Sequence, residues 1–241
     1  MTGYKEKQFI KIEPIEAFQD NYIWLIHNDQ NCIVVDPGDA KPVIEALKRK
    51  SLSLVSILIT HHHADHIGGV SELHKKYPDI TIYTPQKDKY DFVNISLKNG
   101  DEINIPELQI NYKIIEIPGH TRGHIAYYDM KNLFCGDTLF ACGCGRIFDG
   151  THEQMYNSLK KISALPKETR IYCAHEYTKK NIAFALSLKP HDMNLKLRSE
   201  FTSKLKITVP SSLDEELRTN PFLNCDSLET FKKLRDLKDQ Y

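Results

Sequence analysis

The sequence predicts an α/β domain followed by a smaller helical domain. Up to about residue 176, apolar strand-like runs alternate with segments of helical pattern. Beyond residue 178 the strand-like runs stop, and the pattern fits amphipathic helices around a proline-containing link, "KITVPSSLDEE". A chain of 241 residues with 41% hydrophobic residues is long enough for one large domain or a large and a small one. We therefore expect one domain over residues 1–176 and a second over 177–241.

The first elements are three strands and a helix. "NYIWLIH" (21–27) and "NCIVVD" (31–36) predict paired strands, because they are rich in β-branched and aromatic residues and a turn separates them. "KPVIEALKRK" (41–50) predicts a helix with Pro42 in its first turn, where the missing N–H costs little. "LVSILIT" (54–60) is nearly continuously apolar, which predicts a strand buried on both faces.

A histidine-rich turn separates these elements from the next group. After it, "VSELHKKY" (70–77) predicts a short helix. Thr151 and Gln154 fit a capping box that opens the helix "HEQMYNSLKKISAL". Further apolar runs predict strands at 80–83, 112–117, 124–129, 132–137 and from residue 170.

Composition excludes several classes of protein. Lys plus Arg and Asp plus Glu balance at 32 each, so no whole-molecule field attracts nucleic acid or an anionic membrane. The first residues lack the apolar core of a signal peptide, and the longest apolar runs are strand-sized. We expect a cytoplasmic monomer with no nucleic-acid or membrane partner. Its six cysteines should be reduced and mostly buried, namely Cys32, Cys135, Cys142, Cys144, Cys173 and Cys225.

The stretch "THHHADHIGG" (60–69) concentrates metal-competent groups at one turn. His61, His63 and Asp65 are spaced by two, which in extended or turning backbone sends their side chains to one side. On a helix such side chains would diverge, so this is not an HExxH-type site. We expect His66 to point elsewhere and to serve a second ion. Imidazole and carboxylate together suit Zn²⁺, Fe or Mn²⁺.

Later segments supply more donors. "PGHTRGH" offers His120, "FCGDTLF" offers Asp137 and "CAHEYT" offers His175, each just past an apolar strand. Any one of these histidines alone is better explained as a polar loop residue. Their joint occurrence behind four strand ends favours a site for two metal ions. His124 is the best candidate for a supporting residue, and we expect structural or surface roles for His62, His74, His152 and His191.

The motifs "THHHADH", "PGHTRGH", "GDTLF" and "HEYT" resemble the metallo-β-lactamase superfamily in their order and approximate spacing. The resemblance implies an αββα sandwich of two mixed sheets flanked by helices. It assigns one metal ion to His61, His63 and His120. It assigns a second ion to Asp65, His66 and His175, with Asp137 bridging the two.

Further motifs resemble the glyoxalase II, or hydroxyacylglutathione hydrolase, family. They are "FQDNYIWLI", "VDPGDA", "FACGCGRIFDGT", "VPSSLDEELRTNPFL" and "RDLKDQY", and the match runs from about Phe18 to the C-terminus. The resemblance implies hydrolysis of S-D-lactoylglutathione and related 2-hydroxyacylglutathiones to glutathione and D-lactate, the second step of methylglyoxal detoxification. It implies two divalent ions, zinc first with iron or manganese as alternatives. It also implies that Asp65 orients the attacking hydroxide.

Glutathione carries two carboxylates, so its site should be locally basic. The resemblance assigns substrate binding to Arg146, Tyr177, Arg235 and Lys238, and places glutathione on the helical domain. Arg235 and Lys238 share one face of a predicted terminal helix, where charge alone would favour a solvated basic surface. For Arg146, the alternative is a surface ion pair.

The sequence departs from the family pattern at three positions, one of which is among these substrate-binding residues. Arg146 stands where some relatives carry Lys, which keeps the charge but changes the donor geometry. Phe148 stands where some have Tyr, and Asn224 where many have Arg. These departures affect the expected glutathione contacts and leave the expected metal site intact.

Other functions on the same scaffold are a lactonase, a β-lactamase, an RNA-processing nuclease or a persulfide dioxygenase. A nuclease should show a basic surface, which this neutral chain lacks. The dioxygenase uses one iron, and a full second donor set argues against it. A structural metal site, the remaining alternative, tends to be closed, four-ligand and cysteine-rich. A larger His/Asp donor set leaves room for water and favours catalysis.

Overall fold

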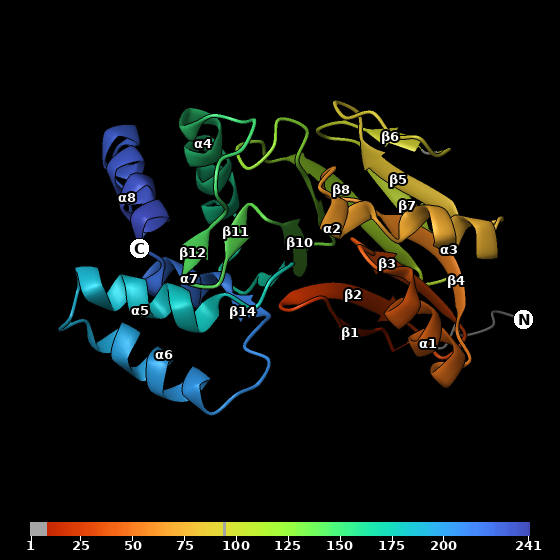
Figure 1. The fold of residues 1–241 in the computed structure, drawn as a ribbon, viewed down its shortest axis with the longest axis horizontal. Helices are drawn as coiled ribbons and strands as arrows, with labels where there is room; N and C mark the ends of the chain where they lie inside the picture. Colours follow the sequence, from red (N-terminus) through yellow and green to blue (C-terminus); the bar gives the residue numbers. More distant parts are fainter. Residues whose placement is uncertain (1–8, 94) are drawn as a thin grey trace, which may run out of the picture.

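Two six-stranded sheets stacked face to face form the centre of the protein (Figure 1). The computed structural model describes residues 9–93 and 95–241. The first sheet is antiparallel from β1 to β3 and parallel from β3 to β6. Its strands, in spatial order, are β1 (Lys11–Ala17), β2 (Asn21–His27), β3 (Asn31–Val35), β4 (Ser53–Leu58), β5 (Thr81–Pro85) and β6 (Ile95–Leu97).

The second sheet contains one parallel pair, β10 with β13, among antiparallel neighbours. A separate two-stranded hairpin consists of β11 (Leu139–Phe140) and β12 (Gly143–Cys144). The strands of the second sheet, in spatial order, are β14 (Ser211–Ser212), β13 (Arg170–Cys173), β10 (Asn132–Gly136), β9 (Ile125–Tyr128), β8 (Ile110–Glu116) and β7 (Glu102–Ile105).

Strand β2 shows how the sandwich is held together. All seven of its residues are buried, and successive side chains point to opposite faces of the sheet. Trp24 joins the cluster shared with the second sheet, where its ring meets that of Tyr172 at a centroid distance of 4.9 Å. Ile23 and Leu25 join a separate cluster on the outer face. Two helices, α1 (Ala40–Lys50) and α3 (Val70–Lys76), cover that outer face (Figure 1).

Most elements predicted from the sequence are confirmed. The strands predicted at 21–27 and 31–36 pair as β2 and β3, and the doubly buried run at 54–60 forms β4. The capping box is present at Thr151, whose hydroxyl accepts the backbone N–H of Gln154 at the start of α4 (His152–Ser163). The predicted mixed α/β class and the two-sheet sandwich are therefore the observed fold.

The prediction that strands stop beyond residue 178 is wrong at one place. Ser211 and Ser212 form β14, which pairs antiparallel with β13 at Ile171 and Arg170. A two-residue strand has no room for an apolar pattern, so only tertiary pairing reveals it. The predicted strands also omit β1, β6 and β7. Strand β1 contains Pro14, and β6 and β7 have only three and four residues.

The C-terminal part contributes four helices beside the hairpin (Figure 1). Helix α8 packs on α4, and its buried Phe231 lies 5.9 Å, between ring centroids, from Tyr156. The domain boundary predicted between 176 and 177 stays a prediction. Within residues 9–93 and 95–241, no helix combines the length and apolar character needed to cross a membrane. The four helices are α5 (Thr178–Leu188), α6 (Met193–Ser203), α7 (Leu213–Thr219) and α8 (Leu228–Gln240).

Candidate metal centre

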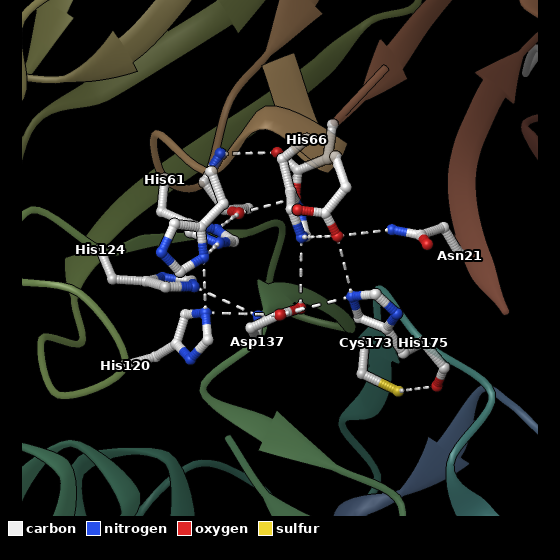
Figure 2. Close-up of polar contacts among 12 residues, drawn as sticks. Asn21, His61, His66, His120, His124, Asp137, Cys173 and His175 are labelled. Carbon is white, nitrogen blue, oxygen red and sulfur yellow. Dashed lines mark hydrogen bonds and ion pairs between the residues drawn. The ribbon is translucent and has the colours of Figure 1, made fainter. Parts of the chain in front are cut away.

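Four segments that follow strands converge on one point between the sheets. Figure 2 shows His61, His66, His120 and His175 arranged around Asp137. His61 comes after β4, His120 lies between β8 and β9, and His175 comes after β13. The residues predicted from separate motifs as metal donors are therefore neighbours in space.

The histidine-rich turn contains a single turn of helix, α2 (Ala64–Ile67), with His63 as its N-cap. Extended backbone therefore reaches only to His63, whereas Asp65 and His66 are helical. Consecutive helical side chains are about 100° apart rather than opposed. Accordingly, His66 Nε2 lies 3.5 Å from Asp65 Oδ2, and the two side chains converge. The expectation that His66 points away from Asp65 is wrong for this reason.

The first donor group consists of His61, His63 and His120. His63 Nδ1 lies 3.1 Å from His61 Nε2 and 3.0 Å from His120 Nε2. Burial, reinforced by neighbouring imidazoles, lowers the pKa of all three rings, and that of His63 falls to about 4. The rings are therefore neutral at pH 7, which is the form that binds a cation.

The second donor group consists of Asp65, His66 and His175. Asp65 Oδ2 lies 3.5 Å from the Nε2 atoms of both histidines and accepts a 2.9 Å hydrogen bond from the Asn21 amide. Burial alone would raise the pKa of Asp65, but the adjacent imidazoles of His175 and His66, together with the Asn21 amide, outweigh burial and hold the pKa well below its usual range. The carboxylate is therefore ionised.

Asp137 lies between the two groups. Its Oδ1 is 3.5 Å from His66 Nε2, and its Oδ2 is 3.4 Å from His120 Nε2 and 3.3 Å from His175 Nε2. Burial acts against its ionisation, yet His66 and His175 outweigh burial and lower the pKa of Asp137 far below its usual value. One ionised carboxylate therefore faces donors of both groups.

Oxygen atoms behind the rings fix the orientation of three histidines. In each case Nδ1 meets an oxygen at hydrogen-bond distance, so a neutral ring carries its proton there and leaves Nε2 for a cation. The pairs are His66 with Asp36 at 3.0 Å, His120 with the Arg146 carbonyl at 2.7 Å, and His175 with Asp20 at 2.9 Å. Against the effect of burial, nearby carboxylates raise the pKa of His66 and His175, so a cation that binds at Nε2 must displace a proton from these two rings.

Two buried polar atoms at the centre indicate whether the site suits a cation. His66 Nε2 and Asp137 Oδ1 are buried and have no hydrogen-bond partner among the described residues. Buried polar atoms are normally paired, so both are left for a ligand. Nitrogen and carboxylate oxygen donors are those that zinc, iron and manganese accept. The donor set therefore fits a binuclear centre of divalent metal ions.

Asp36 contacts the candidate centre from behind and is not among the site residues predicted from the sequence. Its carboxylate accepts the Thr60 backbone N–H at 2.7 Å and the Thr60 hydroxyl at 2.6 Å, besides facing His66. Asp20, behind His175, was missed as well. Asp36 is the last residue of a predicted strand, as Asp137 is. The motif containing Asp36 supported only the family resemblance.

His124 supports the centre from behind, as expected. Its ring stacks on His61 at a centroid distance of 4.6 Å, and its Nε2 accepts the Asp137 backbone N–H at 3.2 Å. His62 faces away from the centre toward Asp88, with 3.3 Å between His62 Nδ1 and Asp88 Oδ2.

A cavity of about 320 Å³ opens over the donors, and Arg146, Phe148 and Tyr177 form part of its wall. The Tyr177 ring stacks on His175 at 4.8 Å, and the Phe148 ring meets His63 edge to face at 4.9 Å. A larger hollow of about 640 Å³ lies elsewhere, beside β4 and β5, but no histidine lines it. The chemistry of the wall, and not its size, identifies the candidate site.

The other two predicted substrate residues do not line this cavity. Arg235 on α8 is only 4% exposed, and its Nη1 donates to the Cys144 carbonyl at 2.9 Å. The Lys238 ammonium lies over the rings of Phe184 and Tyr241, 4.8 and 5.1 Å from their centroids. Arg235 therefore contacts the hairpin strand β12, and Lys238 lies on a neighbouring surface.

Comparison with known proteins identifies the superfamily first. Residues 18–175 match the family model described as the metallo-beta-lactamase superfamily. The fold also resembles the crystal structure of ETHE1 from Myxococcus xanthus, with a TM-score of 0.73 and 24% identity over 95% of this chain and 90% of that one. The chain is therefore a metallo-β-lactamase superfamily protein, as the motifs predict.

Residues 176–241 match the model for the hydroxyacylglutathione hydrolase C-terminus. A hydroxyacylglutathione hydrolase from Photobacterium profundum is 46% identical over 96% of this chain and 100% of the relative. Another, from Nitrosomonas eutropha, is 50% identical over 90% of this chain and 86% of the relative. Within the superfamily, the chain belongs to the hydroxyacylglutathione hydrolase family.

Proposed function

We propose that this protein hydrolyses S-D-lactoylglutathione and related 2-hydroxyacylglutathiones to glutathione and a 2-hydroxy acid. The observation that carries the proposal is Asp137, which faces donors of two groups beneath a cavity with Arg146 in its wall. The family membership supports the same reaction, because the curated relatives bear its name.

Divalent ions bound by these donors would lower the pKa of a water molecule toward about 7 and polarise the thioester carbonyl. His61, His63 and His120 would hold one ion, Asp65, His66 and His175 the other, and Asp137 would contact both. We expect zinc, with iron or manganese as alternatives, because the nitrogen and oxygen donors suit all three.

Asp65 is the proposed positioning group for the attacking water. Its pKa is held low, so it is a permanent hydrogen-bond acceptor, and the Asn21 amide fixes one of its oxygens. The leaving thiolate has a conjugate-acid pKa of roughly 8.5, so it can depart without a general acid. Tyr177 suits hydrogen bonding to the substrate, since burial, reinforced by Asp20 and Asp137, raises the pKa of its phenol.

Arg146 is the proposed direct contact for a glutathione carboxylate. Its side chain is 59% exposed and lines the cavity. The burial of Arg235 supports an indirect role, in which it holds the backbone that carries Arg146. Lys238 forms no ion pair with the described residues and remains a proposed carboxylate ligand.

The test is an assay of S-D-lactoylglutathione hydrolysis by the metal-loaded protein. The reaction is monitored by the decrease in thioester absorbance. We expect turnover that a chelator abolishes and that added metal restores. A lactoyl thioester of N-acetylcysteine, which lacks the γ-glutamyl and glycyl groups, serves as the control and should react with a much higher KM. Equal cleavage by metal-stripped protein would overturn the proposal.

The curated relatives and the C-terminal family match do not favour the lactonase or persulfide dioxygenase alternatives. A cytoplasmic location and a monomeric state stay predictions from the sequence.

A further inference from the structure

Asp239, in the last turn of α8, pairs with two arginines at once. A single oxygen, Oδ1, accepts Arg235 Nη2 at 3.0 Å and Arg146 Nε at 3.2 Å. The side chain of Asp239 is 35% exposed, so this carboxylate borders solvent. An acidic residue at the C-terminal end of a helix is unfavourable for the helix dipole. Its pairing with Arg235, four residues earlier on the same helix, and with Arg146 accounts for its position instead.

The two arginines differ in their freedom to move. Arg235 is buried, is bonded to the Cys144 carbonyl, and packs over the ring of Phe222 at 5.1 Å. Arg146 is 59% exposed, and Asp239 is its only carboxylate partner in the part of the chain that the structure describes. Arg146 can therefore turn toward a ligand in the cavity without disturbing the packing, whereas Arg235 cannot.

We propose that Asp239 is a specificity-determining residue that competes with the carboxylate of the ligand for Arg146. The inference rests on the proposed function, because it takes the ligand to be a glutathione derivative. Asp239 holds Arg146 through Nε and partly neutralises it. A ligand carboxylate at Arg146 either displaces Asp239 or lies beside its negative charge, and both arrangements weaken binding.

This competition acts equally on substrate and product, because the glutathione carboxylates are unchanged by thioester hydrolysis. Weaker binding of both raises KM and speeds release of glutathione. Exposed charge pairs couple modestly, so removing the competing charge should tighten binding by about two- to five-fold. The gain should shrink at high salt, where such interactions are screened.

Asp239→Asn is the test variant, because the amide oxygen still accepts from both arginines while the negative charge is lost. We expect its KM for S-D-lactoylglutathione to fall about two- to five-fold, with a smaller change in kcat. The dissociation constant of glutathione itself, measured by calorimetry, should fall by the same factor. Asp236→Asn is the matched control. It removes the same charge from α8 on the face toward His152, and neither constant should change.

A substrate esterified at both glutathione carboxylates carries no charge that could compete with Asp239 for Arg146. It therefore separates the loss of charge competition in Asp239→Asn from a change in the shape of the site. The advantage of Asp239→Asn should vanish with this ester, and persistence of the advantage would overturn the inference. An unchanged or raised dissociation constant for glutathione would overturn it as well. If Asp239→Asn fails to fold, Asp239→Ser must shift the constant in the same direction. Absence of thioester hydrolysis by the metal-loaded parent would instead contradict the proposed function, and the calorimetric comparison would still test Asp239.

Discussion

Three imidazoles at the centre, those of His66, His120 and His175, each meet an oxygen on the side away from the other donors. His66 faces Asp137 through Nε2 and Asp36 through Nδ1, and Asp36 is itself held by Thr60. The carboxylate therefore sets the tautomer of His66 and increases its basicity toward a cation. Asp36 thus acts on the centre through the His66 ring.

We expect Asp36→Asn to weaken metal binding by about 10- to 100-fold, as loss of an outer hydrogen-bond partner typically does. Chelator competition at pH 7 measures the affinity. Asp39→Asn is the control, because Asp39 caps α1 through the Lys41 N–H. That variant should keep the affinity of the parent. Unchanged metal affinity in Asp36→Asn would show that this carboxylate only holds the Thr60 backbone and hydroxyl and does not support His66.

The predictability of these residues follows from the number of signals that each one carries. The proximity of the seven predicted donors could be foreseen because rare residue types recur behind several strands and match one known order of motifs. Asp36 and Asp20 carry a single signal each, an acidic residue near a strand, which is common in unrelated proteins. The burial of Arg235 could not be predicted from the sequence, because the same spacing of charged residues also occurs on helix faces that are exposed to solvent.

At the scale of elements, the C-terminal helices hold the β11–β12 hairpin in place. Glu216 on α7 is fully buried, and its Oε2 accepts the Cys142 backbone N–H at 2.7 Å. Its Oε1 pairs with Arg198 on α6. Asn220 donates to the carbonyls of Phe140 and Gly143 at 3.2 and 2.9 Å, so the backbone before and after the hairpin turn is anchored. The hairpin leads directly to Arg146.

We expect Glu216→Gln to destabilise the protein by about 3 kcal/mol, because it leaves Arg198 as a buried charge without its close partner. Glu215→Gln removes a partly exposed carboxylate 3.3 Å from the same guanidinium and should cost less than about 1 kcal/mol. Urea unfolding measures both. Adding Arg198→Met to Glu216→Gln should recover part of the loss, and a double variant worse than the sum of the single variants would contradict this account.

Elements were predicted well where a run of side chains fills the space between layers. β2, β4 and α1 carry such runs, so their patterns reveal them. The hairpin strands β11 and β12 have two residues each and are positioned by Glu216 and Asn220, which lie more than 70 residues away in sequence. Local pattern contains no information about such contacts.

For the whole molecule, the metal centre joins the two sheets. His61 follows a strand of the first sheet, whereas Asp137 and His175 follow strands of the second. Ions held between them would therefore link both halves of the sandwich. The balanced net charge of the chain adds no long-range attraction, so local groups such as Arg146 must attract the ligand.

We expect removal of the metal ions to lower the melting temperature by about 5–10 °C, since a ligand at 100 times its Kd contributes about 2.7 kcal/mol. Differential scanning calorimetry before and after chelation measures this, and adding back zinc should restore the parent value. The same chelator already saturated with zinc controls for direct effects on the protein. An unchanged melting temperature after complete metal loss would mean that the donors hold their arrangement without ions.

The short strand β14 reduces the exposed sheet edge at which folded molecules could aggregate. A β-sheet whose outermost backbone groups are free offers a template on which strands of other molecules can add. Here β14 pairs with the outer edge of β13, and the backbone N–H of Leu213, the next residue, donates to the Thr169 carbonyl at 2.8 Å. The segment that leads into the last helices therefore satisfies backbone groups of β13 that could otherwise pair with a strand of another molecule.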